Sequence, residues 1–133
     1  MRHDARQFEP RPELVRAVRA FVADAARSAD VDDNAASLAA SELATNVVRH
    51  VGTPFTVRTF VAAGYLRVEF VDGSSVLPTV RDLAEDADNG RGVYLVEAST
   101  TAWGVESYPS GGKGIWFELG APCGASKALS PSS

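Results

Sequence analysis

The sequence predicts an α/β fold, a two-layer sandwich in which helices pack on one face of a mixed, largely antiparallel sheet. Two observations lead to it. The first fifty residues carry apolar side chains at helical spacing, and later segments alternate β-branched or aromatic residues with polar ones. The order is two helices, a hairpin, a loop, a helix and a second hairpin. Hairpins join neighbouring strands by tight turns, so they favour an antiparallel sheet.

The first helix is predicted to begin at Pro12, after ten polar and irregular residues that we expect to be flexible. Proline suits the first helical turn, where its missing N–H costs no hydrogen bond. From there apolar side chains recur at steps of three and four, and they are Leu14, Val15, Val18, Phe21, Val22, Ala25 and Ala26.

A second helix is predicted from about Asp32 to His50, because residues 30–34 interrupt the first pattern and offer capping side chains. We expect it to bury Leu38, Leu43 and Val47. The sequence Gly-Thr-Pro at residues 52–54 would end it.

The pattern then changes to that of strands. Residues 55–61 and 65–72 flank an Ala-Ala-Gly turn, and the second segment alternates apolar and polar side chains like a half-buried strand. A polar stretch over 73–89 holds an acidic run, and an apolar helix is expected around 93–98. Two further strand-like segments, 101–108 and 114–119, would close the domain as a hairpin.

Composition restricts the function classes. The chain has 133 residues, a net charge of −4 and one cysteine, so it suits one domain and no internal disulfide. The acidic balance argues against a direct nucleic-acid binder, and no apolar run approaches the roughly 20 residues of a membrane span. We expect a cytoplasmic domain over 11–120, a flexible N-terminus over 1–10 and a disordered tail over 121–133.

The second helix carries Glu42, Asn46 and His50 at steps of four, so the three side chains share one face. Such a row is most often only a solvated helix face. The alternative is chemical: the Asn46 carbonyl oxygen can join phosphate oxygens and waters around Mg²⁺. Glu42, one turn earlier, could then deprotonate a nucleophile that attacks a terminal phosphate.

The strand over 65–72 ends in Asp72, followed by Gly73 and Ser74. A carboxylate in this place is most often a turn residue that caps its own backbone. It could instead be a buried acceptor for an exocyclic amine such as that of adenine, because an ionised carboxylate only accepts hydrogen bonds. Ser74 could add a hydroxyl or hold a bridging water.

Two glycine-containing segments complete the set of candidates. Gly90, Arg91, Gly92 and Val93 precede the expected third helix, where backbone N–H groups could approach phosphates, although a plain turn explains the same residues. Residues 109–114 form an expected hairpin tip, in which Lys113 and Gly114 could lie near the phosphates of a nucleotide.

These motifs, taken in order along residues 10–120, resemble the GHKL ATP-binding superfamily. The match begins with the run over residues 42–50, Glu-Leu-Ala-Thr-Asn-Val-Val-Arg-His, and continues with Asp72-x-Ser74, Gly90-Arg91-Gly92-Val93 and the closing glycine-rich strand. Within that superfamily the chain looks most like the small bacterial anti-sigma-factor serine/threonine kinases. The resemblance implies the Bergerat fold, with ATP bound beneath a lid that would correspond to residues 83–89.

The resemblance also implies roles for individual residues. Asn46 would coordinate Mg²⁺ between the phosphates, Glu42 would be the general base and Asp72 would bind the adenine amino group. The remaining expected nucleotide contacts are Arg49, His50, Ser74, Gly90, Arg91, Gly92, Val93, Lys113 and Gly114. The chain departs from the family pattern at Ser74, where a glycine is usual, and at Lys113-Gly114, where many members have Gly-Thr.

The implied function is an anti-sigma factor that binds ATP and Mg²⁺ and phosphorylates a serine or threonine. Its partners would be a sigma factor and an anti-anti-sigma antagonist protein, and a homodimer is an option common in the family. The alternative is a non-catalytic ATP-binding module that captures a partner and uses the nucleotide only as a conformational ligand. The two departures favour this alternative slightly.

Overall fold

The computed structural model describes residues 1–50, 52–72, 96, 98–107 and 113–121. In chain order its elements are β1 (Arg2–Phe8), a short 3-10 helix η1 (Pro12–Leu14), α1 (Val15–Ala29), α2 (Asp33–His50), β2 (Phe55–Ala62), β3 (Tyr65–Asp72), β4 (Ala102–Ser107) and β5 (Lys113–Gly120). None of the helices in these ranges is long and apolar enough to cross a bilayer.

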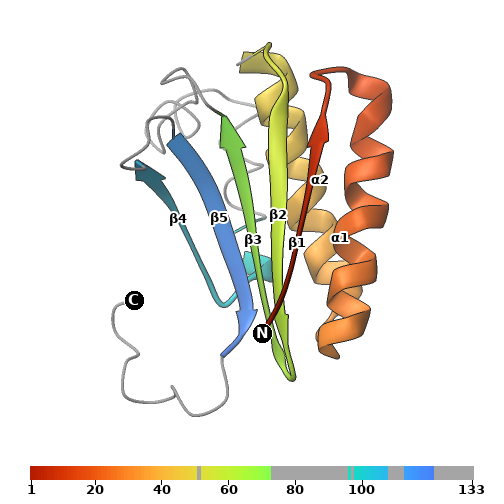
Figure 1. The fold of residues 1–133 in the computed structure, drawn as a ribbon, viewed down its shortest axis with the longest axis vertical. Helices are drawn as coiled ribbons and strands as arrows, with labels where there is room; N and C mark the ends of the chain where they lie inside the picture. The colour runs from red at the N-terminus through yellow and green to blue at the C-terminus, as the bar shows by residue number, and fades with distance from the viewer. Residues whose placement is uncertain (51, 73–95, 97, 108–112, 122–133) are drawn as a thin grey trace.

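The five strands form one open sheet in the order β1-β2-β3-β5-β4, and every pairing is antiparallel. Both helices lie on the same side of this sheet (Figure 1), and the buried side chains between the layers form one apolar cluster. The predicted two-layer α/β sandwich is therefore confirmed. The described strands contain no parallel pair, so the part of the prediction that allowed a mixed sheet is not seen there.

The first ten residues are not an irregular, flexible segment as predicted. Residues 2–8 form the edge strand β1, which pairs with β2 from Arg2 opposite Val61 to Phe8 opposite Phe55. Only Phe8 of this strand is buried, so the alternating apolar pattern that marks a strand is missing from the sequence. The ladder of backbone hydrogen bonds with β2 holds β1 in place, and sequence patterning does not report that contribution.

The two helices follow the prediction closely, with one wrong side chain. α1 buries Val18, Val22, Ala26 and Ala29 and ends at Asp30, which adopts a left-handed backbone conformation (φ 60°). α2 buries Leu43 and Val47 as expected, but Leu38 is 39 % exposed. At that end of α2 the buried residues are small instead, and they are Ala36, Ala39 and Ala40.

Both predicted hairpins are present. The β2–β3 turn includes Gly64 (φ 74°), whose backbone N–H donates to the carbonyl of Ala29 at 2.8 Å and ties the turn to the end of α1. β4 and β5 pair antiparallel over 102–107 and 113–118. Of the expected third helix, Val96, Ala98 and Ser99 are helical and Val96 is buried; the remainder lies outside the described residues.

On the sheet face opposite the helices, β3 is more buried than the pattern of a half-buried strand predicts. Tyr65 and Glu69 of β3 are buried, although they alternate with the core residues. Arg67 lies between them and pairs with Glu69 at 2.9 Å and with Glu118 at 3.0 Å. Its guanidinium also stacks on the Trp116 ring at 4.3 Å. Burial, together with the hydrogen bond to Glu118, raises the pKa of Tyr65.

Candidate functional site

Helix α2 positions the first two candidate residues. The Asp32 carboxylate caps its start by accepting the backbone N–H groups of Asn34 at 3.0 Å and Ala35 at 3.1 Å. Leu43 and Val47 are fully buried and hold the helix against the sheet. Glu42 directly precedes Leu43 in the sequence, and Asn46 directly precedes Val47. The rotation and height of α2, and so the positions of the two polar side chains, are therefore set by core packing.

Asn46 is a buried amide whose nitrogen has no partner. The residue is 3 % exposed, and its Nδ2 forms no hydrogen bond within the described part of the chain. A buried amide N–H₂ left in this state costs about 1–3 kcal/mol relative to a paired one. Such an unpaired group in an apolar setting favours a ligand at this position, since a ligand could supply the missing acceptor.

Asp72 is the second buried polar residue. It ends β3, is 3 % exposed, and its Oδ2 accepts a hydrogen bond from Thr53 Oγ1 at 3.0 Å. Thr53 lies in the short connection between α2 and β2. The hydroxyl therefore joins the end of the helix to the end of the strand and orients the carboxylate. Thr53 thus holds Asp72 from outside the strand that Asp72 ends.

Lys113 and Gly114 lie beside Asp72 in the sheet. β5 begins at Lys113, which is the direct partner of Asp72 in the β3–β5 ladder, and Gly114 is the partner of Val71. Gly114 is buried and Lys113 is partly exposed. The antiparallel register therefore places the start of β5 beside Asp72, at the end of β3.

These residues gather at one end of the sandwich. The last turns of α2, the start of β2, the tip of β3 and the start of β5 all lie at the upper end in Figure 1. Glu42 is partly exposed and forms no hydrogen bond or ion pair inside the described ranges. A carboxylate without a partner near a buried amide is available to accept a proton.

The structure gives less about the other candidates. Arg49 is exposed at the end of α2, and it is engaged in an interaction. His50 is the last residue of that helix, and its side chain lies outside the described residues. The other predicted residues lie outside the described residues altogether. They are Ser74, Gly90, Arg91, Gly92 and Val93, together with the expected lid over 83–89.

Thr53 is the site residue that the sequence reasoning missed. The sequence predicts a role for it only as part of the Gly-Thr-Pro segment that ends the second helix. A hydroxyl residue between a helix and a strand is common in turns, so nothing in the pattern marks it as a partner of Asp72. The antiparallel hairpin provides the only usable signal: it returns residue 72 to the level of residue 55, two positions after Thr53.

The donor set fits a magnesium nucleotide. Asn46 can offer its Oδ1 to a divalent ion while Nδ2 donates to a phosphate oxygen, and Asp72 offers a carboxylate to an amine. In the described ranges no three His, Cys, Asp or Glu side chains are grouped as a metal site.

A family model described as a histidine kinase-like ATPase domain matches residues 8–117, which run from the last residue of β1 into β5. It also includes all the predicted site residues. A search of curated proteins finds no match for the chain. The matched description names an ATPase domain, and this implies that the domain binds ATP.

Proposed function

Because this chain belongs to the histidine kinase-like ATPase domain family, we propose that it is an ATP-binding anti-sigma factor with protein serine/threonine kinase activity. The observation that carries the proposal is the buried, unpaired amide of Asn46, one helical turn after Glu42. The last turns of α2, which carry Asn46, lie at the same end of the sandwich as the tip of β3 (Figure 1), and β3 ends in the buried residue Asp72. In this proposal Asn46 serves the phosphates of the nucleotide and Asp72 serves its base.

Each residue has a separate task in this proposal. Asp72, oriented by Thr53, accepts the exocyclic amine of adenine. Asn46 would hold Mg²⁺ through its side-chain oxygen, and the ion when bound would neutralise phosphate charge. Glu42 takes the proton of an acceptor serine or threonine hydroxyl as its oxygen attacks the γ-phosphorus and the bond to ADP breaks. Lys113, the partner of Asp72 in the β3–β5 ladder, adds a positive charge beside the carboxylate at the base end of the site.

The partner surface that we propose is a basic groove between α1 and α2. It has a volume of about 520 Å³, and the residues that line it are Arg16, Arg19, Ala20, Ala23, Arg27 and Ser37. Arg27 pairs with Asp24 and Asp33. Arg16 and Arg19 are exposed and form no ion pair within the described part of the molecule.

The chain as a whole carries a net charge of −4, so the positive charge of this groove is opposite in sign to that of the whole chain. Unpaired arginines with small alanines between them can accept an acidic segment of a protein by charge complementarity. We therefore assign the groove to an acidic segment of the sigma factor. The anti-anti-sigma antagonist would then be the acceptor of the phosphate.

A second candidate function keeps ATP as a conformational ligand only, with capture of the partner as the whole activity. Two residues of β5 favour it: Lys113 and Gly114 provide no hydroxyl where β5 begins. The two functions differ in one observable, which is transfer of phosphate to the partner.

The test is the intact mass of a candidate anti-anti-sigma protein after incubation with the chain and Mg-ATP. We expect the wild type to add one phosphate and Glu42→Gln to add none while binding ATP with unchanged affinity. Glu13→Gln, a change on the 3-10 helix η1, is the matched control and should transfer normally. Transfer at the wild-type rate by Glu42→Gln would overturn the role of Glu42. Tight ATP binding without transfer by the wild type would select the second candidate.

A further inference from the structure

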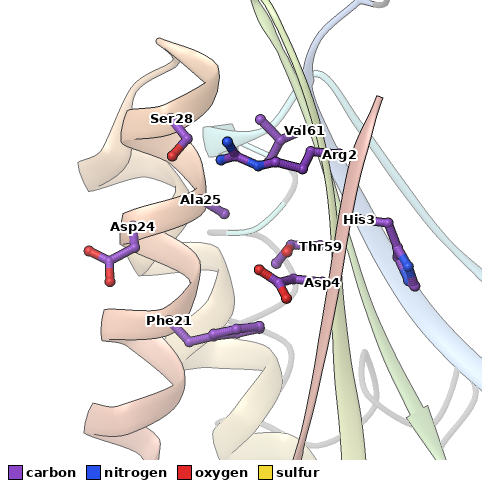
Figure 2. Close-up of a pocket in the computed structure, with 9 residues that line it drawn as sticks. All are labelled: Arg2, His3, Asp4, Phe21, Asp24, Ala25, Ser28, Thr59 and Val61. Atoms are coloured by element: carbon purple, nitrogen blue, oxygen red, sulfur yellow. The ribbon is translucent and has the colours of Figure 1, made fainter.

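A second cleft lies at the edge of the sheet, between β1 and α1 (Figure 2). Its volume is about 170 Å³. Val61 contributes to it, at the end of β2 that pairs with Leu66, whereas Asp72 lies near the opposite end of the same hairpin. The cleft is therefore separate from the candidate nucleotide site.

Small side chains on the helix leave this space open. α1 presents Ala25 and Ser28 toward β1 and β2, and Phe21 closes one end with its ring (Figure 2). Thr59 and Val61 of β2 form the inner wall, and both are almost fully buried. The cleft thus combines an apolar wall with two hydroxyl groups, a lining suited to a small ligand with an apolar part.

The outer wall is formed by two opposite charges on one strand. Arg2 and Asp4 lie two residues apart on the same face of β1, opposite Val61 and Thr59 in the β1–β2 ladder. Figure 2 shows both side chains directed toward α1, while His3 between them points to the other side of the strand. A charged pair in place of apolar residues on the helix-facing side of a strand is unusual, because that side normally contributes to the core.

Neither charge has a partner within the residues that the structure describes. Arg2 and Asp4 form no hydrogen bond and no ion pair there, with each other or with α1. Their Cα atoms are about 7 Å apart, which is the spacing of alternate residues in a strand. A molecule that carries an ammonium group and a carboxylate on neighbouring atoms can span this spacing with one charge-assisted hydrogen bond at each end.

We propose that this cleft binds a free α-amino acid with an apolar side chain. Its carboxylate pairs with the Arg2 guanidinium and its ammonium with the Asp4 carboxylate, while its side chain packs against Phe21, Ala25 and Val61. An inorganic anion would be repelled by Asp4 and a simple cation by Arg2, so the pair of charges selects a zwitterion. A volume of about 170 Å³ holds on the order of ten non-hydrogen atoms, which is the size of such a molecule.

Binding of this ligand would stabilise the edge of the sheet. The amino acid would contact β1 through both charged groups and α1 through Phe21 and Ala25. Only Phe8 of β1 is buried in the core, so the strand has few side-chain contacts of its own near residues 2–4. A ligand that binds only the folded edge shifts the local opening equilibrium toward the closed form.

The test is a ¹H–¹⁵N NMR titration of the full chain with L-leucine, beside N-acetyl-L-leucine and L-leucine amide, each of which lacks one of the two charges. For a ligand of this size we expect a Kd on the order of 1 mM or tighter. Saturable shifts should appear in β1 and around residues 21–28. Because each blocked analogue loses one charge-assisted contact, we expect it to bind at least about tenfold more weakly.

Variants locate the contacts. Arg2 and Asp4 are exposed, so Arg2→Gln and Asp4→Asn should fold normally and each should weaken leucine binding by at least about tenfold. Arg6→Gln is the matched control on the same strand and the same face, outside the cleft, and should bind like the wild type. The proposal is overturned if leucine causes no saturable shifts. It is overturned equally if the blocked analogues bind as well as leucine, or if both variants retain binding.

Discussion

The contact between Thr53 and Asp72 gives a sharp prediction for the variant Thr53→Val. The Thr53 hydroxyl donates to Asp72 Oδ2 at 3.0 Å, and that carboxylate is 3 % exposed. A hydrogen bond to a charged group contributes about 1.5–3 kcal/mol. Asp72 has at least one further interaction, so we take the lower end of this range, about 1.5 kcal/mol, as the expected loss in the free energy of unfolding.

ATP affinity should fall as well, because the same hydroxyl orients the carboxylate toward the base. A contribution of about 1.4 kcal/mol corresponds to a tenfold change in Kd, so we expect Thr53→Val to bind Mg-ATP about tenfold more weakly. Thr53→Ser keeps the hydroxyl and serves as the control, with stability and affinity near those of the wild type. The assays are urea denaturation and calorimetric titration. If Thr53→Val binds ATP like the wild type, or if the serine variant loses as much, the orienting role is wrong.

Three further predictions concern packing and the partner surface. Gly104→Ala would place a Cβ 2.9 Å from the Trp116 ring, and we expect a loss of about 1–3 kcal/mol with a shift in tryptophan fluorescence. Leu43→Ala should cost about 2–5 kcal/mol in urea denaturation, because Leu43 is fully buried. The double variant Arg16→Glu, Arg19→Glu should reduce partner capture at low salt while ATP affinity stays unchanged. Wild-type stability or unimpaired capture would contradict the respective prediction.

The fold was predictable wherever side chains carry a strong period. Both helices and both hairpins follow from apolar spacing and turn residues. β1 did not, because its register with β2 depends on backbone hydrogen bonds and only Phe8 is buried. Leu38 was misjudged for a related reason: helical spacing assigns a face to the core, but it does not say where along α2 that face stops being covered.

The candidate site was predictable in its residue types and less so in its supports. Helix spacing and a strand end predicted Asn46 and Asp72 as binding residues, and both are buried in the structure. Thr53 was not found, because its contact with Asp72 joins residues 19 positions apart. The buried Glu69 on the other sheet face was also unexpected, since its pairing with Arg67 and Arg58 appears only when the strands are aligned.

The most direct test of the account is a calorimetric titration of the chain with Mg-ATP, run beside Asp72→Asn. This variant keeps the shape of the side chain but replaces one carboxylate oxygen with an NH₂ group, which only donates and cannot accept a hydrogen bond from the adenine amine. We predict saturable binding at micromolar Kd by the wild type and its loss in the variant. Absence of heat with the wild type, or equal binding by the two proteins, would contradict the claim that this end of the sandwich is a nucleotide site.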